Sequence, residues 1–115
     1  MRLVPNMQVF APSSLDEMLF AFDNVGKLSS PLYIRYNDSP RLYNLETEWL
    51  SNQQVKSGSD FALLSYGNMS NICFEVVNQL ESKKISGSFY NMRFLEPFDK
   101  SFFEKIANKY DKLII

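Results

Sequence analysis

Two arginines are the residues of this chain best placed to do chemistry on an anion. Arg35 lies at the carboxyl end of the apolar run 32–36, and Arg93 follows the apolar run 86–92. The carboxyl ends of strands form the edge at which open α/β sheets bind ligands, and a guanidinium there can hold a phosphate or a carboxylate. An ion pair between two structural units is an equally good interpretation of both residues. Arg35 and Arg93 are therefore the candidate substrate-binding residues.

The residue types present argue against catalysis by this chain alone. The sequence contains no histidine, so it offers neither a Ser-His-Asp system nor an imidazole ligand for a metal. The single cysteine, Cys73, falls on the apolar stripe of an expected helix, which favours a core residue over a nucleophile. Gly67 ends a strand before a helix, a geometry that can hold an anion, but a simple tight turn is the favoured interpretation. We expect no catalytic, cofactor-binding or metal-binding residue here.

Composition indicates one small globular domain without affinity for nucleic acid. The chain has 115 residues, is 45% hydrophobic and 15% aromatic, and carries a formal net charge of −1 with acids and bases interspersed. This balance provides no field that favours nucleic acid or an anionic membrane. No apolar stretch reaches the roughly 20 residues that span a bilayer. One unpaired cysteine and no secretory signal predict a cytoplasmic location.

The elements that would position these residues alternate between strand and helix. The first unit begins with an apolar strand at residues 8–11. A helix follows, with the capping box Ser14-x-x-Glu17 at its start and an apolar stripe of the kind that normally faces a core. That stripe consists of Leu15, Met18, Leu19 and Phe22. A second strand at 32–36 completes a βαβ unit, which predicts a parallel pair.

A second unit repeats this pattern in longer form. Residues 61–66 and 86–92 read as strands, with a helix between them that Asn68 or Ser70 can cap. Residues 93–97 read as a loop, and Asp99 opens a third helix before a last strand at 112–115. The sequence thus predicts an α/β fold with incomplete parallel sheets: a βαβ unit, a linker and a βαβαβ unit. The expected bounds are 1–40, 41–59 and 60–115, with Trp49 of the linker covering the seam.

Several segments carry a resemblance to a known family. Read in order, they resemble the end of the pyrimidine-binding domain and the start of the carboxyl-terminal transketolase-type domain of 1-deoxy-D-xylulose-5-phosphate synthases. The most specific match is residues 91–99, N-M-R-F-L-E-P-F-D, which resembles the family signature M-R-F-x-x-P-x-D. The other matching segments are residues 2–7, 11–13, 30–36 and 58–67. The β subunits of 2-oxo acid dehydrogenases share the architecture and are the nearest competitor.

This resemblance implies a transferase that depends on thiamine diphosphate and Mg²⁺. Such an enzyme joins a two-carbon fragment of pyruvate to glyceraldehyde 3-phosphate and feeds isoprenoid synthesis. The motifs that bind the cofactor would lie before Met1, and the family's Pro-Arg-Gly after the Arg-Tyr pair is replaced here by Asn37, Asp38 and Ser39. An acid in place of the phosphate-binding arginine repels the substrate.

The resemblance therefore implies the carboxyl-terminal part of such a synthase, a truncated or split product that is inactive alone. An interaction or dimerisation module, or part of a dehydrogenase β subunit, is the alternative. The expected partners are a complementary amino-terminal portion of the synthase or a second copy of the chain, with no nucleic acid and no membrane. No cofactor is expected to bind to this chain by itself.

Overall fold

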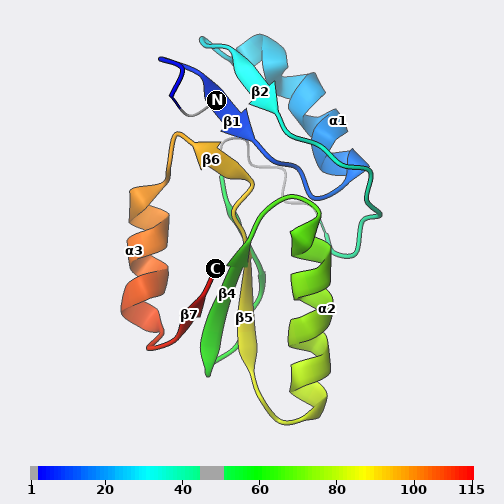
Figure 1. Cartoon of the computed structure of the whole chain (residues 1–115), viewed down its shortest axis with the longest axis vertical. Helices are drawn as coiled ribbons and strands as arrows, with labels where there is room; N and C mark the ends of the chain where they lie inside the picture. The colour runs from blue at the N-terminus through cyan, green and yellow to red at the C-terminus, as the bar shows by residue number, and fades with distance from the viewer. Residues whose placement is uncertain (1–2, 45–50) are drawn as a thin grey trace.

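The computed structural model describes residues 3–44 and 51–115, which form two small sheets with three α-helices (Figure 1). One sheet has the strand order β2-β1-β6 and the other has the order β3-β5-β4-β7. Trp49 lies outside the described residues. The fold class is α/β, as predicted. The helices are α1 (Leu15–Asn24), α2 (Met69–Ser82) and α3 (Lys100–Lys109), with a short 3-10 turn at Val25–Lys27.

The first sheet contains the predicted βαβ unit. Strands β1 (Gln8–Phe10) and β2 (Leu32–Ile34) run parallel in the register Gln8↔Leu32 to Phe10↔Ile34. Helix α1 connects them, and the hydroxyl of Ser14 accepts the amide of Glu17 at its start. The second half of the capping box differs, because the Glu17 carboxylate accepts the amide of Ser13 at 2.7 Å instead of the cap residue's own amide.

The segment 93–97, expected to be a loop, contains the third strand of this sheet. Strand β6 (Phe94–Glu96) pairs antiparallel with β1, and Phe10 lies opposite Phe94. The two rings lie 4.7 Å apart between centroids. Three residues are too few for a period-2 pattern to be visible in the sequence. The open edge of β1 gains a partner, and the chain passes from one sheet to the other within two residues.

The second sheet is a parallel core with one antiparallel edge. Strand β4 (Phe61–Ser65) pairs in parallel with β5 (Gly87–Asn91) on one side and with β7 (Leu113–Ile114) on the other. Strand β3 (Gln53–Lys56) covers the far side of β5 in antiparallel orientation. It lies within the segment 41–59 that was expected to be a linker. Gln53, Gln54 and Lys56 are polar, which is why this edge strand escaped the apolar pattern.

Alternate residues of β4 and β5 build an apolar layer on each face of this second sheet. On one face, Phe61, Leu63 and Phe89 pack with Val77 of α2, and Cys73 is half-buried against the same cluster. Cys73 thus packs against the edge of the core, which agrees with a packing role for this residue. Helix α3 covers the opposite face (Figure 1). The apolar cluster there consists of Ala62, Leu64, Tyr90 and Met92 together with Ile106 of α3 and Tyr110.

Helix α1 has the opposite orientation from the one expected. Its buried residues are Glu17, Ala21 and Asn24. Of its apolar stripe, Leu15, Leu19 and Phe22 are exposed, and Met18 is half-buried. The apolar periodicity predicts the position of the helix correctly. The face of α1 that packs against the sheet, however, carries polar and small side chains.

No helix of the described residues is long and apolar enough to cross a membrane.

Candidate functional site

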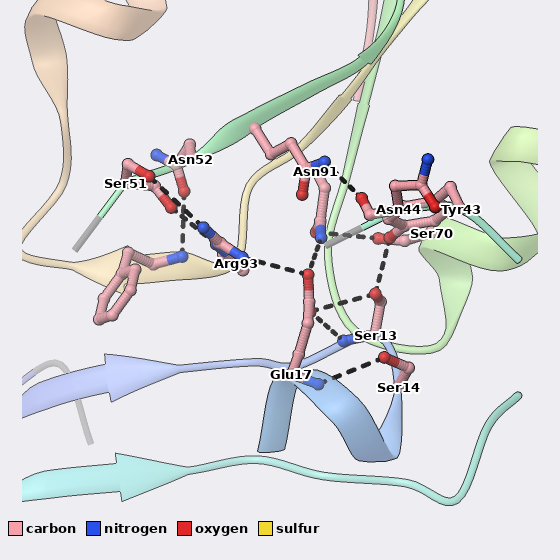
Figure 2. Close-up of polar contacts among 12 residues, drawn as sticks. Ser13, Ser14, Glu17, Tyr43, Asn44, Ser51, Asn52, Ser70, Asn91 and Arg93 are labelled. Carbon is pink, nitrogen blue, oxygen red and sulfur yellow. Dashed lines mark hydrogen bonds and ion pairs between the residues drawn. The ribbon is translucent and has the colours of Figure 1, made fainter. Parts of the chain in front are cut away.

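A buried polar network lies where the two sheets meet, and its residues come from the start of α1 and from the end of β5 with the segment that links it to β6 (Figure 2). Ser13 and Glu17 come from the start of α1, Asn91 ends β5, and Arg93 precedes β6. All four are buried. Polar groups in such a place must find partners inside the protein, because water does not reach them.

The centre of the network is an ion pair between Glu17 and Arg93. The Arg93 Nη1 lies 3.4 Å from Oε1 of Glu17, and the two side chains are 0% and 2% exposed. The same Oε1 accepts Nδ2 of Asn91 at 2.9 Å. The Arg93 Nε donates to the carbonyl of Ser51 at 2.7 Å. Each charge is therefore compensated by an opposite charge and by further hydrogen bonds, the condition under which a buried pair is tolerated.

Tyr43 extends the network towards the core of the second sheet. Its hydroxyl donates to Oγ of Ser13 at 2.6 Å. Its ring packs on Phe74 and Phe89 with centroid distances of 5.4 and 5.9 Å. Burial raises the pKa of the Tyr43 phenol well above its usual range, so this group remains a neutral donor.

The starts of α1 and α2 are joined by Asn71. Its Nδ2 donates to the carbonyls of Ser13 and Pro40 and to Oγ of Ser39, at 3.2, 2.8 and 3.1 Å. The amide of Gly67, at a positive φ of 60° in the preceding turn, donates to the carbonyl of Ala11 at 3.3 Å. Tight turning is thus the observed role of Gly67. Asn68 is the cap residue of α2, as predicted, although its side chain makes no capping bond.

Beside these helix starts lies a cleft of about 430 Å³ that contains Asp38. Two carboxylates, Asp16 and Asp38, and one guanidinium, Arg41, are its charged side chains. Arg41 Nε already lies 3.2 Å from Oδ2 of Asp16. The formal charge of the lining is −1, which disfavours a phosphate.

Arg35 and Arg93 lie on either side of β1 and have different surroundings. The amide of Arg35 bonds the carbonyl of Phe10 at 2.9 Å, and the carbonyl of Arg93 accepts the amide of Ala11 at 2.8 Å. The Arg35 side chain is exposed. The Arg93 side chain turns inward to Glu17 and Ser51. Its contacts are those of the ion pair between structural units that the sequence left open as an alternative; substrate binding by either arginine stays a prediction.

The residues that line the cleft that contains Asp38 do not fit a thiamine diphosphate site. A diphosphate in the cleft would face Asp16 and Asp38 with one shared arginine. Among residues 3–44 and 51–115, no group of three carboxylate or thiol side chains gathers in an arrangement that could hold a metal ion.

No pattern in the sequence predicts the part that Asn91, Tyr43 and Asn71 play in the network. The capping box predicts a role for Glu17 at the helix start, but it does not predict the ion pair with Arg93. One signal was present: Arg93 stands between Met92 and Phe94. A charge inside an apolar run indicates burial with a partner.

The chain resembles the carboxyl-terminal part of longer enzymes. A 1-deoxy-D-xylulose-5-phosphate synthase from Porphyromonas gingivalis is 31% identical over 127 residues, which cover 99% of this chain and 19% of that protein. The synthase of Parabacteroides distasonis is 26% identical with the same coverage. This chain therefore spans about a fifth of the length of the curated relatives it matches.

Solved structures agree with this placement. A structure titled "Split gene transketolase, inactive beta4 tetramer" superposes with a TM-score of 0.87 at 25% identity and covers 98% of this chain and 39% of that one. A Pichia stipitis transketolase mutant has a TM-score of 0.74 at 17% identity, over 94% of this chain and 17% of that one, and shows the shared fold. The family model "Transketolase, C-terminal domain" matches residues 51–115. Since that match covers more than half of the sequence, the chain belongs to the transketolase C-terminal domain family.

Proposed function

We propose that this chain is the carboxyl-terminal portion of a composite synthase of the 1-deoxy-D-xylulose-5-phosphate synthase kind, and that it does not catalyse the reaction alone. The observation that carries this proposal is the length relation: 99% of the chain matches only 19% of the Porphyromonas gingivalis relative. The reaction of pyruvate with glyceraldehyde 3-phosphate would need thiamine diphosphate and a divalent metal, as the family implies. The rest of the assembly would supply the groups that hold them.

The charge of the cleft supports the second half of the proposal. Asp38 stands where the resemblance implies a phosphate-binding arginine, and Asp16 adds a second carboxylate. Arg41 offers a cation, but it is shared with Asp16. A sugar phosphate entering this cleft would meet net repulsion.

We propose three parts within the chain: residues 1–40 as the end of a pyrimidine-binding-like domain, 41–59 as a linker, and 60–115 as part of a transketolase C-terminal-like domain. The separate sheets that contain β1 with β2 and β4 with β5 support this division. Strands β3 and β6 modify it, because the second half of the linker adds an edge to the second sheet and residues 94–96 add an edge to the first.

The test is an assay of the purified chain. Pyruvate, glyceraldehyde 3-phosphate, thiamine diphosphate and Mg²⁺ are mixed with the chain, and the product sugar phosphate is quantified by mass spectrometry. The full-length Porphyromonas gingivalis synthase is the positive control. We expect no product above the level without enzyme. Turnover by this chain alone would refute the proposal.

A second assay examines the cleft and the candidate arginines. Inorganic phosphate is titrated into the chain by calorimetry. We expect no heat of binding from the unaltered chain. D38R should bind phosphate at least about tenfold more tightly than the unaltered chain, because a repulsive charge in the cleft becomes attractive. D111R makes the same charge change at an exposed position away from the cleft lining and should give no heat of binding. Heat with the unaltered chain that disappears in R35Q would instead support anion binding at Arg35.

Partner chains follow from the same proposal. The split-gene transketolase structure is titled as a β4 tetramer, so a chain of this family can assemble with its own copies. We propose that this chain also works in an assembly, with further copies or with a complementary amino-terminal portion.

A further inference from the structure

The outer face of α1 is apolar, and the inner face is not. Leu15, Leu19 and Phe22 are 47%, 51% and 57% exposed, whereas Glu17 and Ala21 are 2% and 0% exposed. At 100° per residue, the three exposed side chains fall within about 60° of one another around the helix. This is a continuous stripe along the side of α1 that faces away from the first sheet.

Two inward contacts fix this orientation. Glu17 must point inward to reach Arg93, and Ala21 packs against Phe10 and Phe94 in the small core of the first sheet. Turning the stripe towards the sheet would expose the ion pair and place large side chains where the small Ala21 now packs. The stripe therefore stays outside, as an apolar surface of the kind that marks a contact with another protein surface.

The stripe can pair with a second copy of itself in an antiparallel orientation. Two copies of α1 can lie antiparallel with Met18 of each copy opposite Leu19 of the other. In this register, Leu15 of each copy faces Phe22 of the other. Each large side chain then meets another apolar one along the whole seam. Such a pairing has two-fold symmetry and leaves no unmatched end, as an isologous interface requires.

The charges of α1 favour the same orientation. Asp23 lies in the last turn, which contains no basic residue, so its charge is disfavoured by the negative end of its own helix. In the antiparallel pair Asp23 would lie opposite Ser14, at the positive start of the partner helix. Asp16 would face Ala21, so no carboxylate faces another. A parallel pair would place Asp23 beside Asp23.

We propose that a second copy of this chain docks on the stripe of Leu15, Leu19 and Phe22, with the two α1 helices antiparallel. This inference rests on the assembly proposed above and names its surface and its occupant. A ten-residue helix is about 15 Å long. The contact is therefore small compared with the roughly 800 Å² per partner of a stable interface, and the dimer is reversible and depends on concentration.

Sedimentation velocity between about 1 and 500 µM tests the surface. The unaltered chain should shift from monomer to dimer across this range. L19E and F22E should each weaken association at least about tenfold, because a charge is forced into the apolar seam. I72E is the matched control, since Ile72 is an apolar residue of α2 with a similar exposure of 53%. It should associate like the unaltered chain, and circular dichroism should show that all variants are folded.

Cysteine cross-linking tests the orientation, in a C73A background that removes the native thiol. A mixture of L15C and F22C chains should form a disulfide-linked heterodimer, because the two positions face each other. L15C alone should cross-link at least tenfold more slowly, since its copies lie about 10 Å apart along the axis, beyond disulfide reach. Faster cross-linking of L15C with itself would show a parallel pair and overturn the proposal.

Three other results would also overturn it: a monomer at every concentration, a dimer that L19E and F22E leave intact, or association that appears only after the amino-terminal portion of the Porphyromonas gingivalis relative is added. These results are independent of the activity assay. The chain can thus fail to dimerise and still be an inactive portion of a synthase, and the reverse also holds.

Discussion

The two sheets of this molecule are stabilised in different ways. The second sheet has a helix on each face, and alternate residues of β4 and β5 pack beneath α2 and α3. The first sheet has one helix, and its apolar core consists of Phe10, Ala21 and Phe94 with two half-buried strand residues. Much of what holds it to the rest of the chain is polar, through the pair of Glu17 and Arg93. The second sheet is thus covered by its own helices, and the first depends on its neighbours.

The largest effect should come from breaking the ion pair. Arg93→Met leaves the buried carboxylate of Glu17 without its cation, and we expect a loss of about 3–5 kcal/mol in the free energy of unfolding, measured with urea. Lys100→Met at the exposed pair with Glu104 is the control and should cost less than about 0.5 kcal/mol. The double variant Glu17→Gln/Arg93→Met should cost less than the sum of its parts. A loss below about 1 kcal/mol for Arg93→Met would show that the first sheet does not depend on this pair.

A matched pair of truncations compares the helices directly. Ile106→Ala in α3 removes a side chain that is 3% exposed, and it should cost about 2–5 kcal/mol. Leu19→Ala in α1 removes a side chain that is half exposed, and in dilute monomer it should change stability by less than about 0.5 kcal/mol. Thermal unfolding followed by circular dichroism at low protein concentration measures both. Equal losses of stability in Ile106→Ala and Leu19→Ala would show that α1 and α3 are packed equally well against their sheets.

Tyr43 connects the two regions through a hydroxyl with a raised pKa. Tyr43→Phe loses the bond to Ser13 and should cost about 1 kcal/mol at pH 7. A phenol whose pKa is raised by folding gives up its proton more easily in the unfolded chain. Stability is therefore fully present below the unfolded pKa of about 10 and falls as the pH rises above it. Between pH 9 and 11, the free energy of unfolding of Tyr43→Phe should fall less than that of the unaltered chain. The same slope of this free energy against pH in both proteins would contradict the prediction.

The smallest effects concern the helix caps. Asp99 Oδ1 accepts the amide of Phe102 at 2.9 Å, whereas Ser14 Oγ lies 3.4 Å from the amide of Glu17. A charged acceptor at a shorter distance is the stronger cap, so Asp99→Ala should cost about 1 kcal/mol and Ser14→Ala about 0.5 kcal/mol. Urea midpoints measured side by side decide the order. A larger loss for Ser14→Ala would show that the first region relies on its cap more than the geometry indicates.

The strand–helix rhythm was predictable because local periodicity encodes it. The helix at Ser14, the strand 61–65 and the helix opened by Asp99 all lie where capping residues and apolar spacing indicated. Strands β3 and β6 were not predictable, since β3 has three polar residues among its four and β6 is only three residues long, so neither carries such a period. The outward stripe of α1 was also missed. Periodicity shows that an apolar face exists, but it does not show what lies against that face.

The candidate site was predictable only as single residues. Arg93 was identified, and an ion pair was one of its two interpretations, but Glu17 is 76 positions away in the sequence. Glu17 and Arg93 meet because the chain leaves the second sheet after β5 and joins the first sheet at β6. No local sequence pattern predicts this change of sheet. Asp38 was singled out only through the resemblance to the synthase family, since a lone aspartate after a strand has no distinctive signal of its own, and the cleft around it was not predicted.

Strand β6 has a consequence for how the chain can be dissected. It comes from the second half of the sequence yet completes the first sheet against β1. A protease cut or an engineered gene boundary near residue 60 would separate β6 from β1. The downstream piece would keep β6 without its partner strand, and the upstream piece would expose the edge of β1 at Phe10. The two halves should therefore be produced well only when expressed together, and swapping either half with a homologue would need to carry residues 94–96 along with the first half.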